Sequence, residues 1–222
     1  MARPKITLYL DTVSPFAYEA YYILRNDPVF KSVDVTYVPI FLGGLMNKCG
    51  NTPPIQIKNK DKWINTERLR WASHFNIPIT HEMPPDFPPL TLHIMRAACA
   101  LQQDDDNTTP DRMIRALDHL FARYWVDRAP THQPDVLKEE LVKIFGLQDT
   151  EKILKDAAGP AKKQLIENTD LAFSEGAFGL PWMVCTNSKG EKEGFWGVDH
   201  LGQIVRFLGV QRPGEGGWKA VL

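Results

Sequence analysis

Strand-like sequence at both ends of the chain, with helical sequence between, constrains the fold more than any other feature. Residues 6–10 alternate between side-chain types as a strand does, residues 14–26 have helical periodicity, and residues 33–40 again favour a strand. The helical segment is long enough to cross over between parallel strands, so a right-handed βαβ unit is predicted. We expect the ligand side of such a unit at the carboxyl ends of its strands.

Residues 43–159 have no convincing strand alternation and are predicted to form one helical unit. Residues 61–75 favour a helix, whereas the prolines of residues 83–89 remove hydrogen-bond donors and indicate an extended connector. Residues 109–111 (Thr-Pro-Asp) predict a helix start, with a capping hydroxyl, a proline in the first turn and an acid favoured by the helix dipole. The apolar face of that helix consists of Met113, Leu117, Leu120, Phe121 and Tyr124.

The sequence returns to strand chemistry near its carboxyl end. Residues 161–175 predict a helix, residues 182–186 and 193–196 a hairpin that turns near Gly190, and residues 199–208 a last helix. The complete order is βαβ, helices and then αββα, which indicates an α/β fold in which both ends of the chain contribute to one sheet. The predicted domains are a sheet-containing unit of residues 1–42 and 160–222 and an inserted helical unit of residues 43–159.

Composition indicates a globular protein and disfavours polyanionic partners. The 222 residues are 43% hydrophobic and 24% charged, which supplies a sizeable core. The 26 basic and 27 acidic residues give a net charge of −1 without a long basic run, so we expect no nucleic-acid partner. A signal-peptide pattern and an apolar stretch of membrane-spanning length are both missing. We therefore expect no membrane association and an intracellular location, in the cytoplasm, mitochondrion or peroxisome.

The three cysteines, Cys49, Cys99 and Cys185, form no Cys-x-x-Cys pair and have no metal-ligand spacing. This pattern favours a reducing compartment and no structural disulfide. The six histidines show no metal-binding pattern either, so no metal is predicted. A chain without Cys-x-x-Cys cannot carry out dithiol exchange at a helix N-terminus, which excludes an ordinary disulfide oxidoreductase.

Four short segments occur in a specific order: residues 11–18 (Asp-Thr-Val-Ser-Pro-Phe-Ala-Tyr), 50–54 (Gly-Asn-Thr-Pro-Pro), 176–181 (Gly-Ala-Phe-Gly-Leu-Pro) and 196–199 (Trp-Gly-Val-Asp). Each alone is a common loop signal. As an ordered set, with helical sequence between them, they make the chain resemble the kappa-class glutathione transferases over about residues 5–218. The resemblance implies the layout of the disulfide oxidoreductase DsbA and its relatives, which is a thioredoxin-like fold with an inserted all-helical domain. It also implies a homodimer that binds glutathione and a small hydrophobic electrophile.

Ser14 has a structural and a catalytic interpretation. A serine followed by proline makes a good helix cap and a preorganised first turn. The position also directly follows the first strand, where thioredoxin-type oxidoreductases carry a reactive cysteine and where helix amides favour a thiolate. The resemblance implies that Ser14 is catalytic and donates a hydrogen bond to the glutathione thiolate, with Pro15 and Phe16 beside it in the binding site. Phe16 and Tyr18 are expected to shape the electrophile pocket.

Two loops near the carboxyl end carry the remaining contacts to the ligand backbone. Pro181 could simply open a strand. The resemblance instead implies a cis Leu180–Pro181 bond, with the Leu180 backbone bonded to the cysteinyl part of glutathione like an added strand. Asp199 is expected to cap the last helix, and the resemblance implies that it binds the γ-glutamyl end of glutathione. Many family members have serine in place of Val198, so only the Val198 backbone can contact the ligand there.

Asn51 and Lys60 lie in the loop that leads into the helical segment, where any soluble protein places turn and surface residues. The resemblance assigns Asn51 to glutathione binding and pairs Lys60 with the glycyl carboxylate. Lys58 and Lys62 are alternatives to Lys60 in that pairing. Aromatic residues in a helical context are expected in the core rather than at a ligand, and these are Trp63, Trp71, Phe121 and Trp125.

Three functions fit these patterns. The leading hypothesis is a kappa-like glutathione S-transferase, in which a bound thiolate attacks small electrophiles. A 2-hydroxychromene-2-carboxylate isomerase with glutathione as cofactor is the first alternative, because it shares the fold, the serine and the glutathione. The second is a glutathione-binding or interaction protein without catalytic turnover, because fold alone does not imply activity and Val198 removes a side-chain contact.

Overall fold

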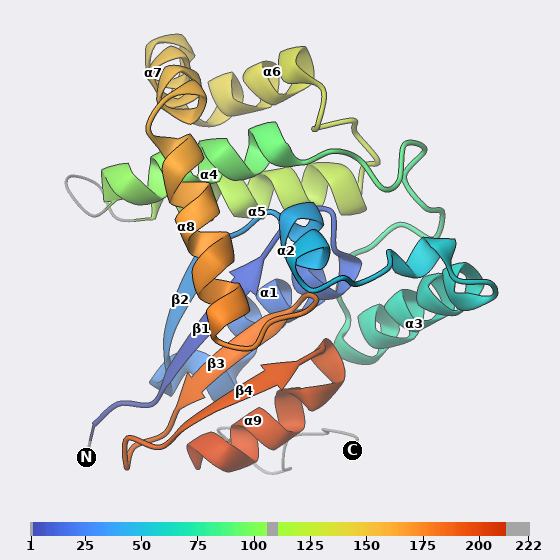
Figure 1. Ribbon diagram of the computed structural model, residues 1–222, viewed down its shortest axis with the longest axis vertical. Helices are drawn as coiled ribbons and strands as arrows, with labels where there is room; N and C mark the ends of the chain where they lie inside the picture. The colour runs from blue at the N-terminus through green and yellow to red at the C-terminus, as the bar shows by residue number, and fades with distance from the viewer. Residues whose placement is uncertain (1, 106–110, 212–222) are drawn as a thin grey trace.

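The computed structural model describes residues 2–105 and 111–211 of the chain, without the side chains of residues 104 and 105. Its centre is one mixed sheet with the strand order β2-β1-β3-β4 (Figure 1). β1 (Lys5–Leu10) pairs in parallel with β2 (Asp34–Pro39) and antiparallel with β3 (Trp182–Thr186). β4 (Lys192–Trp196) pairs antiparallel with β3. Both ends of the chain therefore form a single sheet, and the predicted fold class is confirmed.

β1 lies inside the sheet and sets the position of the loops that follow the strands. Ile6, Leu8 and Leu10 are fully buried and Tyr9 nearly so. A run of buried residues in place of strict alternation is typical of a strand covered on both faces. Tyr9 lies opposite Trp182 in the antiparallel register, so the loop before β3 comes level with the loop after β1.

α1 (Pro15–Asn26) follows β1 after a four-residue loop and packs against it. Proline occupies the first helical position, where its fixed φ suits the helix and its missing N–H costs no hydrogen bond. The helix ends where Asp27 takes an extended backbone and caps the 3-10 turn Pro28–Ser32, which leads into β2. The predicted strand, helix and strand order of this end is confirmed.

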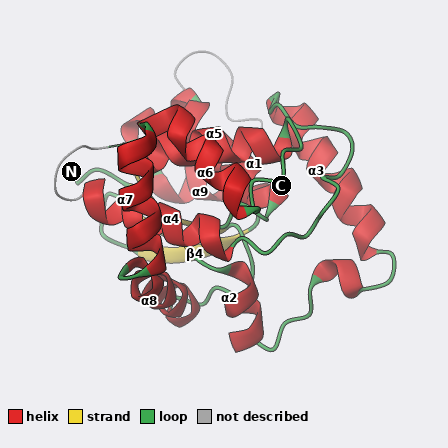
Figure 2. Ribbon diagram, turned by 90° about the horizontal axis from the view of Figure 1, so that it is seen from above, coloured by secondary structure: helices red, strands yellow, loops and turns green. Residues whose placement is uncertain are grey.

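The middle of the chain is helical, as predicted. Its described residues, 43–105 and 111–159, contain no strand. Figure 1 places most of these helices above the sheet, with α3 to one side, and Figure 2 shows the same group from above. The helices are α2 (Leu42–Lys48), α3 (Lys60–Phe75), α4 (Leu92–Asp105), α5 (Arg112–Trp125), α6 (Pro134–Phe145) and α7 (Leu147–Ala158), with a 3-10 turn at Pro54–Gln56. The exact domain boundaries stay a prediction.

The start of α5 differs from the prediction. The helix begins at Arg112, and Asp111 precedes it with a φ of 79°, a left-handed backbone that a right-handed helix cannot contain. Thr109 and Pro110, the other two residues of the predicted start, lie outside the described residues. The predicted apolar face of this helix is confirmed, because all five of its residues are buried.

One predicted core residue is at the surface. Trp63 is 55% exposed, because α3 buries the face that carries Ile64, Arg68 and Ala72 instead. Phe121 and Trp125 are fully buried, and Trp71 is partly buried against the core. Helical context alone therefore predicted three of the four aromatic positions.

The carboxyl end begins with α8 (Ala161–Ser174), which is followed by the predicted hairpin of β3 and β4. The predicted last helix divides into the 3-10 turn Val198–His200 and α9 (Leu201–Leu208). The expectation that Asp199 caps this helix is wrong, because Gly197 precedes the turn and His200 occupies the cap position of α9. Gly197 has a φ of 91°, a backbone that favours glycine. Among the described residues, no helix has the combined length and apolarity needed to cross a membrane.

Candidate ligand site at the N-terminus of α1

Ser14 is the N-cap of α1 and is almost fully buried. Its Oγ accepts a hydrogen bond from the Ala17 N–H at 3.1 Å, so the structural interpretation of this serine is confirmed. A hydroxyl that accepts one hydrogen bond still has its own proton to donate. The cap therefore leaves Ser14 able to donate to an anion in front of the helix.

Asp11 organises the loop between β1 and α1. Its carboxylate is fully buried and accepts hydrogen bonds from the N–H groups of Val13 at 3.2 Å and Leu42 at 2.9 Å. Its carbonyl accepts the Ser14 N–H at 3.1 Å. Burial raises the pKa of Asp11 to about 6, although hydrogen bonds from Leu42, Thr91 and Val13 act in the opposite direction. Asp11 thus joins the cap of α1 to the start of α2, a role that nothing in the local sequence indicates.

The loop before β3 lies beside this helix end. The Leu180–Pro181 peptide bond is cis, as predicted. The Pro181 carbonyl accepts a hydrogen bond from the Gly197 N–H at 3.0 Å, which joins this loop to the turn before α9. Within residues 2–105 and 111–211, the Leu180 N–H and C=O have no hydrogen-bond partner. They are therefore available to an extended ligand.

The 3-10 turn that carries Val198 and Asp199 contacts α1. Val198 is buried, whereas the Asp199 carboxylate is half exposed and its Oδ2 lies 3.4 Å from the His200 Nδ1. An accessible carboxylate thus lies in the turn that is joined to the Pro181 loop. It can attract an ammonium group of a ligand.

Asn51 joins the same group of loops. Its Nδ2 donates a hydrogen bond to the Phe178 carbonyl at 2.9 Å, and the Cys49 Sγ lies 3.4 Å from the Ala177 carbonyl oxygen. Both contacts lie a few residues before the cis proline. Lys60, in contrast, is exposed at the first position of α3, on the far side of the Pro54–Gln56 turn.

The two aromatic residues expected at the electrophile pocket have different environments. Phe16 is half-buried and packs against the core from the first turn of α1. Tyr18 is buried, donates its hydroxyl to the Pro78 carbonyl at 2.7 Å and stacks on Phe121 with ring centroids 5.4 Å apart. Tyr18 therefore packs α1 against α5. Phe16 remains as the predicted aromatic wall of the pocket.

Contacts from the helical region support the site without touching the predicted ligand residues. The Trp125 Nε1–H of α5 donates to the Thr12 carbonyl at 2.9 Å, just before the cap of α1. Glu19, one turn after Ser14, is fully buried, and burial raises its pKa well above the usual range while the Arg68 guanidinium acts against this shift. Nothing in the local sequence signalled this contact, because Trp125 and Thr12 are 113 residues apart.

The chemistry available here is stabilisation of a ligand anion. Ser14 and Ala17 occupy the helix start, so this site has no thiol of its own at either position. Pro15 has no N–H and the Ala17 N–H is bonded to the Ser14 Oγ, so the helix dipole and the Phe16 N–H are what favour a negative charge at this end of α1. The Ser14 hydroxyl can donate to the same charge. The described residues include no group of three or more side chains suited to hold a metal ion.

Comparison with known proteins agrees with this architecture. The family profile of the DSBA-like thioredoxin domain matches residues 5–209. The chain is similar to glutathione S-transferase kappa 1 of Caenorhabditis elegans, with 29% identity over 95% of this chain and 93% of the relative. It is also similar to glutathione S-transferase kappa 1 of Homo sapiens, with 25% identity over 94% and 92% of the two chains. Among solved structures, a 2-hydroxychromene-2-carboxylate isomerase superposes with a TM-score of 0.74 at 20% identity, covering 92% of this chain and 94% of that one.

Proposed function

The chain belongs to the DSBA-like thioredoxin domain family, and we propose that it is a kappa-class glutathione S-transferase that conjugates glutathione to small hydrophobic electrophiles. The observation that carries this proposal is Ser14 at the N-cap of α1, beside the cis-proline loop, with Ala17 in place of a second thiol. The similarity to the kappa 1 transferases over nearly the whole chain supports it.

Glutathione fits the polar groups that the loops offer. The free N–H and C=O of Leu180 suit the cysteinyl backbone as an added strand would. The Asp199 carboxylate suits the γ-glutamyl ammonium, and the Val198 backbone lies beside it. Asn51 is next to the cis-proline loop, and Lys60 is exposed and free to reach the glycyl carboxylate.

Catalysis requires that the site favour the ionised thiol over the neutral one. The Ser14 hydroxyl and the dipole of α1 stabilise the thiolate more than the thiol, so the thiol proton passes to water without a separate general base. The thiolate sulfur then forms a bond to the electrophilic carbon, and a leaving group such as chloride departs with the electron pair. Conjugation of this kind would detoxify the electrophile. We also propose a homodimer, which the resemblance to the kappa class supports and light scattering tests.

The test is replacement of Ser14 by alanine. A hydrogen bond to a charged group contributes about 1.5 to 3 kcal/mol, so Ser14→Ala should reduce the ionised fraction or reactivity of bound glutathione by about 10- to 150-fold. Glutathione should still bind, and the pH optimum should rise. Ultraviolet titration of the bound thiol, with chlorodinitrobenzene turnover, measures both effects.

Asp27→Ala is the matched control, because Asp27 also caps a helical turn, accepting the Val29 N–H at 2.9 Å, but lies at the opposite end of α1. Both variants should lose about 1 kcal/mol of stability, and only Ser14→Ala should shift the thiol titration. Equal titrations in the two variants would show that Ser14 is only a cap. Turnover of a hydroxychromene carboxylate without any conjugation would instead assign the isomerase reaction.

A further inference from the structure

A small cavity lies where α2, α4 and α8 meet, at helices that run close together in both views (Figures 1 and 2). Its volume is about 120 Å³. Apolar side chains form much of its wall, contributed by Phe41 before α2, Leu92 of α4, and Leu165 and Ile166 of α8. None of the residues assigned above to glutathione lines it, so it is separate from the candidate glutathione site.

Positive charge from three helices surrounds this cavity. Lys48 of α2, Arg96 of α4 and Lys162 of α8 line it, against one acid, Asp170. Asp170 is already paired, because its Oδ1 lies 2.8 Å from the Lys48 Nζ. The lining therefore has a formal net charge of 3 − 1 = +2, which favours an anionic occupant.

Arg96 gives the cavity a specific donor. Its Nε atom is buried and has no hydrogen-bond partner among the described residues. A guanidinium stays charged at every physiological pH, and buried donors are normally satisfied by protein, water or ligand. The cavity is also lined by Arg96, and a carboxylate matches the planar donor arrangement of its guanidinium.

We propose that this cavity binds a small carboxylate with a compact apolar body, of the size of one aromatic ring. The volume of about 120 Å³ is below the about 150 Å³ of an apolar cavity that encloses benzene, and this hollow is open to solvent, so it takes no more than one ring, with the carboxylate at its mouth. The apolar walls favour an amphipathic anion over inorganic phosphate, because phosphate would leave Leu92 and Leu165 without an apolar partner. The carboxylate faces Arg96, and the apolar body packs between α4 and α8.

Titration of the full-length protein with benzoate tests the proposal. Benzoate should bind with a Kd of about 1 mM or tighter, and benzyl alcohol, which has a similar size without the charge, at least about tenfold more weakly. Arg96→Met removes the charged donor at nearly constant volume and should weaken benzoate binding about tenfold or more. Saturation-transfer NMR and calorimetry give these affinities directly.

Two adjacent lysines provide a matched pair of variants. Lys162 lines the cavity, whereas Lys163 does not, is strongly exposed and pairs with Glu167 at 3.4 Å. Lys162→Ala should weaken benzoate binding about two- to fivefold, while Lys163→Ala and Ser14→Ala should leave it unchanged. This pair also decides the question if Arg96→Met does not fold.

Several results would overturn the assignment. Equal affinities for benzoate and benzyl alcohol would show that the cavity does not recognise a carboxylate. Binding of inorganic phosphate alone would show that it does not recognise an apolar body. Loss of benzoate binding in Ser14→Ala would place the ligand at the glutathione site instead. If benzoate does not bind at all, the cavity is not a ligand site. This holds also if the reason is that a second copy of the chain covers the three helices.

Discussion

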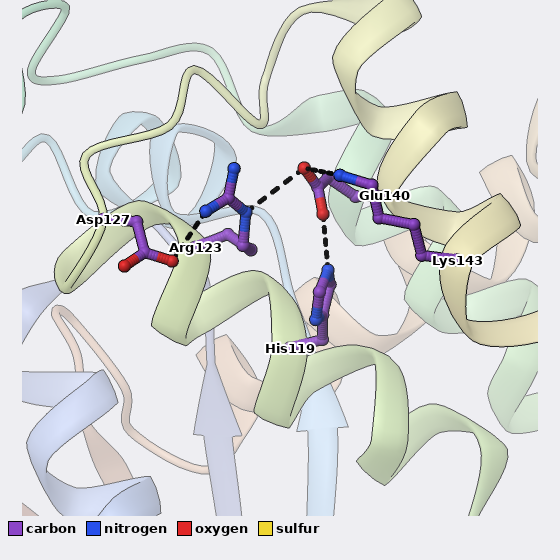
Figure 3. Close-up of polar contacts among 5 residues, drawn as sticks. All are labelled: His119, Arg123, Asp127, Glu140 and Lys143. Carbon is purple, nitrogen blue, oxygen red and sulfur yellow. Dashed lines mark hydrogen bonds and ion pairs between the residues drawn. The ribbon is translucent and has the colours of Figure 1, made fainter.

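Two carboxylates are almost equally buried in this molecule but have opposite surroundings. Asp11, at the carboxyl end of β1, accepts hydrogen bonds from the backbone N–H groups of Val13 and Leu42. Glu140 of α6 instead meets three basic side chains, as Figure 3 shows. Its oxygens lie 2.6 Å from the His119 Nε2, 3.2 Å from the Arg123 Nε and 2.8 Å from the Lys143 Nζ.

The two environments move the two pKa values in opposite directions. Burial acts to raise the pKa of Glu140, but hydrogen bonds from Lys143 and His119 and the charge of Arg123 outweigh it and hold the pKa at about 2. Burial dominates at Asp11 and raises its pKa to about 6. Burial therefore does not decide ionisation by itself. In the helical region, the ionised Glu140 carboxylate joins α5 to α6. In the candidate site, burial disfavours the ionised form of Asp11.

The largest effect should follow from removing Glu140. Glu140→Ala leaves Arg123, His119 and Lys143 without their common partner, and loss of one member of a buried pair typically costs about 3–5 kcal/mol. These basic groups reach water, which screens them, so we expect a free energy of unfolding about 2–3 kcal/mol lower at pH 7. Urea denaturation measures it.

Glu139→Ala is the control for that variant, because the neighbouring Glu139 is exposed on the same helix. It should change the free energy of unfolding by no more than about 0.5 kcal/mol. If the two variants had equal stability, the charged cluster of α5 and α6 would be only a surface feature.

The pH dependence of stability should have opposite signs at the two carboxylates. The pKa of Asp11 is higher in the folded protein, about 6, than the ordinary value of 3.8, so its stabilising contribution is present at low pH and is lost as the pH rises through 6. The pKa of Glu140 is lower when folded, about 2 against 4.5, so its contribution is present above 4.5 and is lost as the pH falls toward 2.

Asp11→Asn isolates the first of these effects. The amide stays neutral, so between pH 5 and pH 7.5 the wild type should lose about 1–2 kcal/mol of unfolding free energy relative to the variant. The same comparison for Glu140→Gln should show a wild-type advantage that is constant over this range and shrinks below pH 4.5. A wild type that gains stability over Asp11→Asn as the pH rises would mean that Asp11 has a charged partner.

The elements of the fold could be predicted because their signals are local. The strand of residues 6–10, the helix opened by Ser14 and the hairpin around Gly190 each follow from periodicity and turn residues within a short window. The start of α5 could not be predicted in this way, because the left-handed backbone of Asp111 depends on the loop before it. Trp63 was misplaced because the polar side chain of Arg68, held by backbone carbonyls, occupies the buried face of α3.

The candidate site was predictable only in part. The cap at Ser14 follows from a Ser-Pro motif visible in the sequence itself, whereas the cis bond before Pro181 was expected from the resemblance to the kappa class. Asp11 and the contact from Trp125 to Thr12 were missed, because burial and partners from distant segments give these residues their roles. Asp199 was expected as a helix cap, but the 3-10 turn before α9 moved the cap position to His200.

The smallest effect should come from the outer edge of the Glu140 cluster. Lys143 is more than half exposed and lies one turn from Glu140 on the same helix, so its ion pair is largely screened by water. Lys143→Ala should lower the free energy of unfolding by only about 0.5 kcal/mol at low ionic strength, and by less in about 1 M salt, where the Debye length is about 3 Å. Paired urea denaturation curves at the two salt concentrations measure both values. A loss as large as that of Glu140→Ala, or one that salt does not reduce, would show that Lys143 acts as a buried partner of Glu140, and the contrast with Asp11 would then rest on a desolvated ion pair rather than on three separately hydrated cations.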